Sequence, residues 1–336
     1  MKAVGYYAAG PIDRSDALVD LSLPAPLPAS HDLIVRVHAV SVNPVDTKVR
    51  AGMNPVGGSA RVLGFDAAGI VEAVGSDVSL FKVGDEVFYA GDITRPGTNA
   101  QLHAVDERLV GRKPHTLDWA AAAALPLTSI TAWEAIFDRL DVRRPVPGAH
   151  AILIVGSGGV GSMAIQLAKV LTDLTVITTT ALPQGEAWAR TLGADHVIDY
   201  RQPMAESFAA LKIDPPGFVF STTHTEDHLS EIVKLIAPQG RISFIDDPHM
   251  LDIVSLKSKM LSAHWEYMFG RAMYQTPDLI EQHKLLSEIS RLVDAGRIAS
   301  TVAERLSPIC AETVRKAHAR VESGTLRGKI VVEGWD

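Results

Sequence analysis

Hydrophobic residues follow two different patterns along this chain, and the change between them comes near its middle. In the first third, short segments of alternating hydrophobic and polar residues are separated by glycine-containing turns. This pattern predicts strands at residues 33–40, 69–75 and 83–88. Short strands at this spacing, without long helices between them, indicate a small barrel or sandwich. Two apolar, alanine-containing segments, 119–125 and 129–140, then predict helices.

From residue 151 onward, predicted strands alternate with predicted helices. The apolar run 151–155 is too short for a buried helix and ends at a glycine, so we expect a central parallel strand. The further strands of this pattern are 174–178, 196–198, 218–220 and 241–245, and the helices between them include 160–171, 186–192 and 228–236. Such alternation predicts a doubly wound parallel sheet with right-handed crossovers.

The last part of the chain has a third arrangement. Residues 279–296 and 313–322 have the periodicity of amphipathic helices, and the chain finishes on an apolar strand at 328–332. We expect that strand to pair within the β-rich N-terminal part, because a terminal strand needs a partner. At 336 residues the chain exceeds one ordinary domain. The predicted fold class is therefore α/β, with a β-rich domain and a doubly wound parallel-sheet domain.

A glycine motif follows the strand 151–155 directly. Gly156-Ser157-Gly158-Gly159-Val160-Gly161 has the Gly-x-Gly-x-x-Gly spacing. The first glycine permits a tight turn, the second lets a pyrophosphate approach the backbone, and the third lets the helix pack on the strand. Free N–H groups at the helix start then face the anion. Because strand, glycines and helix come in the required order, we predict that these six residues bind a dinucleotide; the alternative is a tight turn without a ligand.

Composition excludes several classes of protein. The net charge is −7 and no run of Lys or Arg reverses it, which argues against a nucleic-acid partner. No apolar leader or membrane-spanning stretch is evident, so we expect a cytoplasmic protein without a membrane partner. Cys310 is the only cysteine, which rules out intrachain disulfides and cysteine-based zinc clusters.

Five motifs, taken in order, resemble those of the medium-chain dehydrogenase/reductase superfamily. They are Asn43-Pro44-Val45-Asp46, Gly64-Phe65-Asp66-Ala67-Ala68-Gly69, Leu125-Pro126-Leu127-Thr128, the glycine motif and Gly193-Ala194-Asp195. Within the superfamily the chain is similar to the zinc-independent quinone oxidoreductases, and above all to the zinc-type alcohol dehydrogenase-like subgroup. The resemblance implies a GroES-like catalytic domain of residues 1–122 completed by 270–336, a Rossmann domain of residues 123–269, an active site in the cleft between them, and a homodimer.

The residues do not favour a catalytic zinc, so we expect no metal. Such a zinc takes three protein ligands, usually Cys or His, and keeps one open position. Zinc-dependent relatives have a cysteine where this chain resembles them at Asn43-Pro44, and a His-Glu pair where Gly64-Phe65-Asp66 stands. His224 and His228 have i, i+4 spacing, but we place both in a loop after a strand, as solvated histidines without a third ligand.

Without a metal, hydrogen bonds or a cation must polarise the substrate oxygen. The resemblance places Asn43, Lys48 and Thr128 at the active site as candidates for this catalytic task. Each has a structural alternative: Asn43 in an Asn-Pro turn, Lys48 on the surface, and Thr128 as a helix cap. Zinc-free relatives often have a tyrosine where this chain has Lys48, so a phenolic proton donor is not expected there.

The choice of cofactor depends on the loops after the second and third strands of the parallel sheet. NAD sites place an acidic residue roughly 20 positions after the glycines. Residues 178–182 contain no Asp or Glu, which removes repulsion of a 2′-phosphate, although Ala181 and Leu182 supply no cation. By resemblance Tyr200 lines the 2′-phosphate site, and Arg201 adds a nearby cation. The other residues expected to contact the cofactor are Thr179, Thr180 and Ser221. We therefore expect NADPH, with NADH as the alternative.

These observations together predict hydride transfer from NADPH to a quinone or an α,β-unsaturated carbonyl. Such acceptors suit a site without metal, because the charge that develops is delocalised onto oxygen. Two alternatives stay open: an alcohol dehydrogenase that uses hydrogen-bond donors in place of zinc, and a non-catalytic NADPH-binding sensor or scaffold. The aromatic segment 264–269 is expected to be a sheet-edge strand against a second subunit, with lining of an apolar pocket as its alternative.

Overall fold

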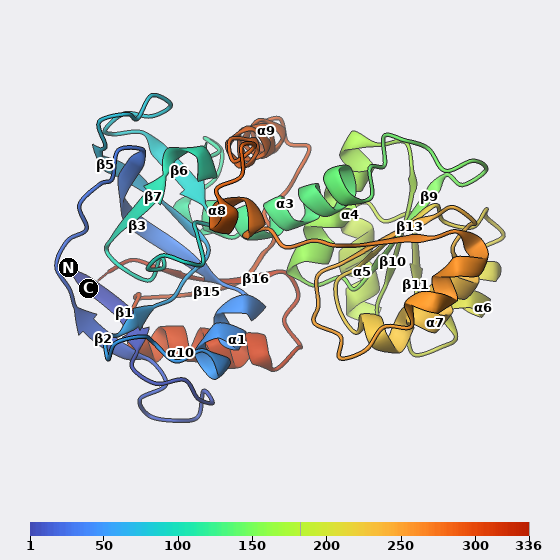
Figure 1. The fold of residues 1–336 in the computed structure, drawn as a ribbon, viewed down its shortest axis with the longest axis horizontal. Helices are drawn as coiled ribbons and strands as arrows, with labels where there is room; N and C mark the ends of the chain where they lie inside the picture. The colour runs from blue at the N-terminus through green and yellow to red at the C-terminus, as the bar shows by residue number, and fades with distance from the viewer. Residues whose placement is uncertain (182, 336) are drawn as a thin grey trace. The chain divides into compact units, whose positions relative to one another are not determined.

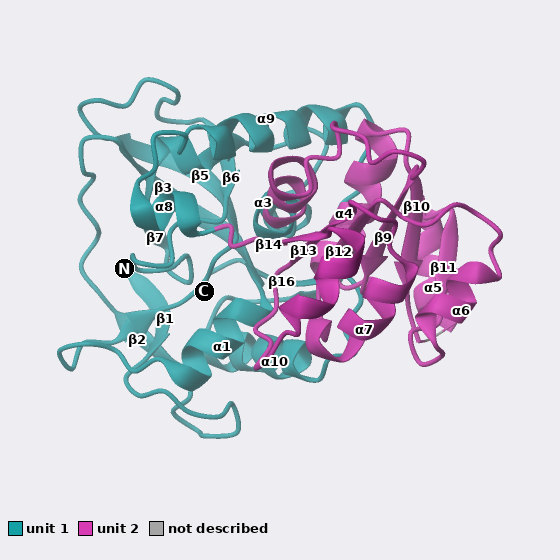
Figure 2. Ribbon diagram, turned by 45° about the vertical axis from the view of Figure 1, so that its right-hand side comes forward, with its two compact units in different colours: residues 1–130, 269–336 teal, residues 131–268 magenta. Residues whose placement is uncertain are grey.

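The computed structural model describes residues 1–181 and 183–335, and the chain divides into two compact units. The first unit contains residues 1–130 and 269–336, and the second contains residues 131–268 (Figure 2). The boundary falls at Ile130 and Thr131, whereas the sequence predicts it at residues 122 and 123. Both ends of the chain belong to the first unit.

The first unit is built on largely antiparallel sheets around the long strand β3 (Asp32–Val42) (Figure 1). One sheet has the order β15-β16-β3-β5-β6-β8, and β7 also pairs with β3. A second sheet has the order β2-β1-β4. The bounds of these strands are β1 (Lys2–Tyr6), β2 (Val19–Ser22), β4 (Arg61–Val62), β5 (Ala67–Val74), β6 (Glu86–Tyr89), β7 (Leu102–Asp106), β8 (Val110–Arg112), β15 (Val302–Leu306) and β16 (Lys329–Glu333). The predicted strands at 33–40 and 69–75 are confirmed as β3 and β5.

One predicted strand of this unit, 83–88, begins later than its pattern indicates. Gly84 has a φ of +92°, in the left-handed region that glycine tolerates. The Asp85 carboxylate accepts a hydrogen bond from the Lys82 N–H at 3.1 Å, which closes a turn. Strand β6 therefore starts only at Glu86.

The C-terminal strand pairs where the sequence predicts it. Strand β16 is antiparallel to β3, with Ile330 opposite Val42 and Val332 opposite Val40. This register continues to bring Lys329 beside Asn43, the residue that follows β3. Two segments from opposite ends of the chain thus meet at the same end of the sheet.

Short helices complete the first unit. They are α1 (Pro44–Gly52), η1 (Glu107–Leu109), α2 (Trp119–Ala123), the first half of α3 (Pro126–Trp133), α8 (Gly270–Tyr274), α9 (Glu281–Asp294) and α10 (Ala311–Glu322). The predicted helix 129–140 is α3 followed by a π-helical turn, Glu134–Arg139, in which the Leu140 N–H bonds to the Ala135 carbonyl. The stretch Trp119–Arg139 is long and apolar enough to cross a membrane by those criteria alone, but its most apolar segment is 94% buried, as in a core helix.

The second unit is a parallel sheet with the strand order β11-β10-β9-β12-β13-β14. Its strands are β9 (Ala151–Val155), β10 (Thr175–Thr179), β11 (His196–Ile198), β12 (Phe218–Ser221), β13 (Arg241–Phe244) and β14 (Ser262–Trp265). Its helices are α4 (Gly159–Leu171), α5 (Pro183–Thr191), α6 (Met204–Ala209), α7 (Thr225–Leu235) and the 3-10 segment η3 (Ile253–Lys259). The order reverses at β9, so the predicted doubly wound sheet is confirmed.

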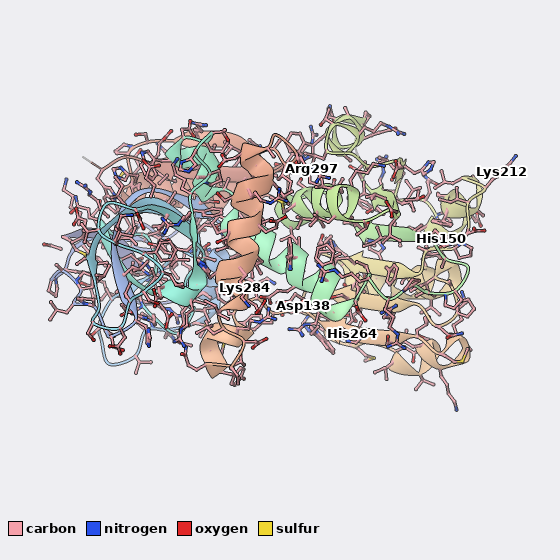
Figure 3. All side chains as sticks on the ribbon, turned by 90° about the horizontal axis from the view of Figure 1, so that it is seen from above. Asp138, His150, Lys212, His264, Lys284 and Arg297 are labelled. Atoms are coloured by element: carbon pink, nitrogen blue, oxygen red, sulfur yellow. The ribbon has the colours of Figure 1, made fainter. Side chains whose placement is uncertain are left out.

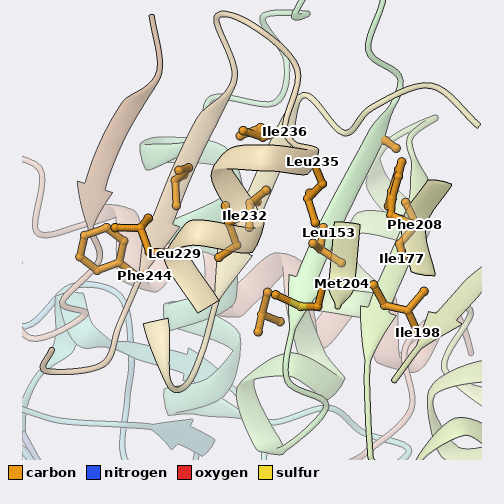
Figure 4. Packing of buried hydrophobic residues seen from close by; sticks show 14 of the residues in the cluster. Leu153, Ile177, Ile198, Met204, Phe208, Leu229, Ile232, Leu235, Ile236 and Phe244 are labelled. Atoms are coloured by element: carbon orange, nitrogen blue, oxygen red, sulfur yellow. The ribbon is translucent and has the colours of Figure 1, made fainter. Parts of the chain in front are cut away.

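Apolar side chains of the strands pack against α6 and α7 to form the core on one face of this sheet (Figure 4). Leu153 and Ile177 of the strands meet Phe208 of α6 and Ile232 of α7 in one buried cluster. Both faces of the middle strands are covered, which is why they are continuous apolar runs rather than alternating ones.

Strand β14 is the edge of the sheet, but it contains only residues 264 and 265 of the segment 264–269, so the edge-strand prediction holds for these two residues and is wrong for 266–269. It pairs in parallel with β13 along Ser262 to Trp265. Figure 3 shows the side chains of the chain and labels His264 of this strand.

Candidate functional site

The glycine motif forms the turn between β9 and α4, and two of its glycines are required by the fold itself. Gly156 has a φ of +97°, and a Cβ there would lie 2.5 Å from the Thr222 Oγ1. A Cβ on Gly161 would lie 2.0 Å from the carbonyl oxygen of Gly156. The first glycine thus makes the turn, and the third lets the helix start close to the strand.

Gly158 has no such reason within the protein. Its φ of −70° suits any residue, and a Cβ placed there meets nothing within 4 Å. It is the N-cap of α4, whose first N–H groups have no carbonyl partner within the helix. An open space before a helix N-terminus is suited to an anion, so the turn fits the pyrophosphate of a dinucleotide.

Two hydroxyl groups bond to the backbone of this turn. Thr179, buried at the end of β10, accepts a hydrogen bond on Oγ1 from the Gly156 N–H at 2.9 Å. The Ser157 carbonyl accepts one from the Ser162 hydroxyl at 3.2 Å. The Thr179 side chain therefore fixes the glycine turn, and its predicted contact with the cofactor stays a prediction, as do those of Gly159 and Val160.

The predicted 2′-phosphate residues lie in the loops after β10 and β11. Thr180 is half-buried, and its N–H bonds to the Ile198 carbonyl, whereas Leu182 lies outside the described residues. Tyr200 is 42% exposed, and its ring centroid is 5.8 Å from that of His228.

Arg201 is already engaged by a neighbouring carboxylate. Its Nη2 lies 2.6 Å from the Asp199 Oδ2, and its Nε lies 3.0 Å from the Asp199 Oδ1. The Arg201 hydrogen bonds lower the pKa of Asp199. A phosphate at this position would share its cation with that carboxylate, a competitor that sequence spacing did not reveal.

Ser221 is buried at the end of β12 rather than open to the turn. Its Oγ lies 2.8 Å from the Thr225 Oγ1, which also bonds to the Asp246 Oδ1 at 2.5 Å. The side chain therefore helps to fix the start of α7, and its predicted contact with the cofactor stays a prediction.

The two spaced histidines are placed differently from the expected loop. His224 is the exposed N-cap of α7 with a φ of 51°, whereas His228 lies within α7 and is half-buried. The loop assignment is therefore wrong for His228, because α7 begins at Thr225. Their ring centroids are 6.4 Å apart.

The candidate catalytic residues belong to the first unit. Asn43 precedes α1, Lys48 lies exposed on α1, and Thr128 is buried in α3. The Thr128 hydroxyl donates to the Leu125 carbonyl at 3.1 Å. The Asn43 Nδ2 donates to the Asp66 Oδ2 at 2.8 Å, and its Oδ1 accepts from the Lys329 Nζ. Asn43 thus has structural partners at both ends of its amide.

A buried polar cluster surrounds Asn43, and sequence reasoning missed most of it. Its members are Asn43, Asp46, Asp66 and Lys329, all of them buried. Burial raises the pKa of Asp46 to about 7, and it also raises the pKa of Asp66 against the opposing effect of Lys329. Burial lowers the pKa of Lys329. The available signal was a charged residue inside an apolar segment, as at Asp66 and Lys329.

Two family models match this chain. A family model described as alcohol dehydrogenase GroES-like domain matches residues 29–114, and one described as zinc-binding dehydrogenase matches residues 192–332. A zinc-type alcohol dehydrogenase-like protein of Staphylococcus aureus strain MSSA476 is 36% identical over 339 residues, covering 99% of both chains. The mitochondrial NAD(P)H oxidoreductase RTN4IP1 of Homo sapiens is 31% identical over 335 residues, covering 90% of this chain and 81% of that protein.

Solved structures share the fold over the whole chain. A protein of Rhizobium etli CFN 42, described as of zinc-dependent alcohol dehydrogenase type, is 60% identical with a TM-score of 0.98, covering 100% of this chain and 98% of that one. The quinone oxidoreductase of Coxiella burnetii is 26% identical with a TM-score of 0.79, covering 100% and 99%.

Several of these descriptions mention zinc, so the donor atoms of the cluster were tested against that metal. Within residues 1–181 and 183–335, no three His, Cys, Asp or Glu side chains are grouped so that they could hold a metal ion. The cluster offers an amide and two carboxylates, without the Cys or His that catalytic zinc prefers. The cation that Asp66 contacts is the Lys329 ammonium, at 3.2 Å. These residues do not fit a zinc site.

Proposed function

The chain belongs to the medium-chain dehydrogenase/reductase superfamily, and we propose that it is an NADPH-dependent oxidoreductase that transfers hydride to a quinone or an α,β-unsaturated carbonyl without zinc. The open space at Gly158 carries the cofactor part of this proposal. That glycine is needed neither for backbone conformation nor for packing, so a ligand that must approach the backbone accounts for it.

The residues of the second unit have separate tasks toward the cofactor. The N–H groups at the start of α4 would hold the pyrophosphate, and Tyr200 with Arg201 would face the 2′-phosphate. The nicotinamide, when bound, supplies the hydride. Preference for NADPH rests on the absence of an acidic residue at the end of β10, and it is weakened by the Asp199 carboxylate beside Arg201.

The acceptor class follows from the donors that the first unit offers. A site with hydrogen bonds and no metal ligands stabilises a carbonyl oxygen less than a metal does. An activated acceptor needs less help, because the charge left by hydride addition at carbon spreads to oxygen. A proton from solvent or from a side chain then completes the reduction. The name of the human relative and the quinone oxidoreductase fold neighbour are consistent with this class of reaction.

The proposal is tested by NADPH oxidation with a panel of quinones, enones, enals, simple aldehydes and, in reverse, simple alcohols. We expect turnover with quinones or enones and none with simple alcohols. Protein treated with a chelator should keep its activity, and elemental analysis should find no stoichiometric zinc. Activity that is lost to the chelator and restored by zinc would overturn the metal-free assignment.

We also propose that the protein is a homodimer joined along β14. An edge strand leaves unpaired backbone groups, and the exposed aromatic residues here are unusual for a solvent-facing edge. Trp265 is 59% exposed and Tyr267 is 50% exposed, and the neighbouring η3 exposes Ile253 and Val254. Light scattering should give twice the chain mass of 36.1 kDa. Trp265→Lys should shift it toward the monomer, whereas a monomeric wild type contradicts the proposal.

A further inference from the structure

Lys329 is a buried lysine whose side-chain nitrogen lies among three oxygen atoms. Its Nζ donates to the Val42 carbonyl at 3.1 Å and to the Asn43 Oδ1, and it lies 3.2 Å from the Asp66 Oδ2. Two of these oxygens belong to carbonyl groups and one to the carboxyl group of Asp66. Three acceptors around one nitrogen match the three protons of an ammonium group.

Asp66 is the complementary carboxylate. Its Oδ1 accepts from the Leu127 N–H at 2.8 Å, and its Oδ2 accepts from the Asn43 Nδ2 at 2.8 Å in addition to Lys329. All three neighbours can donate, which matches the acceptor capacity of an ionised carboxylate. These bonds fit an ion pair, whose charges the surrounding donors and acceptors stabilise, whereas burial alone favours the neutral forms.

This ion pair joins segments that are far apart in the sequence. Lys329 lies 286 positions from Asn43, and Leu127 lies 61 positions from Asp66. Asp46 ties in the Gly64 loop, since its two carboxylate oxygens accept from the N–H groups of Gly64 and Asn43. The start of α1, the loop before β5, the start of α3 and the start of β16 thus share one buried network.

We propose that Lys329 and Asp66 are positioning residues of the active site, whose ion pair orients the Asn43 amide and holds the turn that carries Thr128. This inference rests on the proposed function and deepens it. Asn43 and Thr128 are the two buried candidates for contact with the substrate oxygen. Asp66 bonds directly to the Asn43 amide and to the N–H of Leu127, the residue before Thr128. Lys329 pairs with Asp66 and donates to the Oδ1 end of the Asn43 amide.

The test compares Lys329→Met, Asp66→Asn and the double variant in steady-state kinetics, NADPH binding and thermal unfolding. Removing one charge leaves its partner buried and unpaired, so we expect Lys329→Met to lower the Tm by about 10 °C. Removing both charges should restore most of that loss. We expect kcat to fall about 100-fold in the single and the double variants, because the amide and the turn are no longer held. The Kd for NADPH should stay within about twofold.

Arg95→Met is the matched control. Arg95 pairs with the buried Asp32 through two hydrogen bonds of 2.8 and 2.7 Å in the same unit, away from the cluster. It should lower the Tm and leave kcat unchanged. If the double variant regains kcat together with its Tm, or if folded Lys329→Met keeps its full kcat, the cluster has only a structural role and the inference fails. The double variant keeps the test decisive if Lys329→Met does not fold.

Hydrogen exchange of the Leu127 amide gives a result that does not depend on turnover. This N–H is held by Asp66, so the peptide around residues 125–130 should exchange faster in the double variant, with the glycine turn unchanged. If the wild type reduces no acceptor, the proposed function fails while this measurement still decides whether the ion pair holds the turn. Unchanged exchange at Leu127 overturns the inference.

Discussion

The three spaced glycines of the glycine motif are under different structural constraints in this protein. Gly156 and Gly161 satisfy the fold: one has positive φ, and the other has a carbonyl oxygen 2.0 Å from the place of its missing Cβ. Gly158 has neither constraint. The spacing of the motif is visible in the sequence, but only the structure separates the glycine without a structural constraint from the two that the fold requires.

Gly158→Asp should therefore fold normally and lose the cofactor. The open space accepts a side chain, but the carboxylate repels a pyrophosphate, so the Kd for NADPH should rise about 100-fold or more. Gly161→Ala should instead lower the Tm by about 5 °C, because its Cβ would overlap a backbone oxygen. Fluorescence titration and thermal unfolding of both variants check this pair. Unchanged affinity in folded Gly158→Asp would contradict the placement of the cofactor.

We expect the Asp199–Arg201 pair to determine how strongly NADPH is preferred over NADH. Arg201→Ala should weaken NADPH by about ten-fold and leave NADH nearly unchanged, because only NADPH carries the 2′-phosphate. Asp199→Asn should strengthen NADPH, since it removes a negative charge and releases the guanidinium. Dissociation constants for both cofactors at one ionic strength measure the effect. Equal losses for NADPH and NADH in Arg201→Ala would show that the residue supports the loop instead.

At the scale of elements, the π-helical turn after α3 and the segment after β14 bring two acidic side chains together. Glu266 is buried, and its Oε2 accepts from the Arg139 Nε at 2.8 Å. Burial, and then the nearby Glu134, raise the pKa of Glu266 to about 9. Burial and Glu134 therefore favour the protonated carboxyl group, and Arg139 only partly opposes this shift.

This pair predicts that stability decreases as pH rises from the ordinary pKa of glutamate to about 9. A folded-state pKa above the unfolded one gives a contribution that is complete below the ordinary pKa of glutamate and is lost as pH rises through about 9. Glu266→Gln keeps the shape of the side chain but does not titrate. The Tm of the variant minus that of the wild type should therefore increase by about 5 °C between pH 6 and pH 9. Glu312→Gln, at an exposed position on α10, is the control. Parallel pH profiles for wild type and Glu266→Gln would refute this assignment.

Periodicity predicted most of the elements well, because the burial of side chains determines both the hydrophobic pattern and the position of helices and strands. Strands β9 and β11 have the bounds that their patterns indicate, and α4 differs by one residue. Periodicity carries no information on pairing between distant segments. It could not show that Lys329 meets Asn43, or that Glu266 meets Arg139, since these contacts depend on register and on chain reversals far along the sequence. It also missed the turn at Gly84, whose neighbours are apolar enough to resemble a strand.

For the whole molecule, the difference between contiguous motifs and contacts between distant segments explains what could be predicted about function. The dinucleotide turn is contiguous, residues 151–161, so strand, glycines and helix are visible together. The candidate catalytic cluster collects residues from the segments around 43, 66, 127 and 329, and each alone has an ordinary structural explanation. The resemblance found Asn43 and Thr128; it gave no role to the ion pair that holds them.

We propose that this chain moves a hydride from NADPH to an activated carbon, and isotope transfer tests this proposal most directly. NADPH deuterated at C4 of the nicotinamide, with each stereochemical position labelled in turn, is mixed with the protein and the best enone of the panel, and the product is analysed by mass spectrometry. We expect one of the two labelled forms to leave one deuterium on the carbon β to the carbonyl. Tight NADPH binding with no deuterium in any product would contradict the account and favour a non-catalytic nucleotide-binding protein.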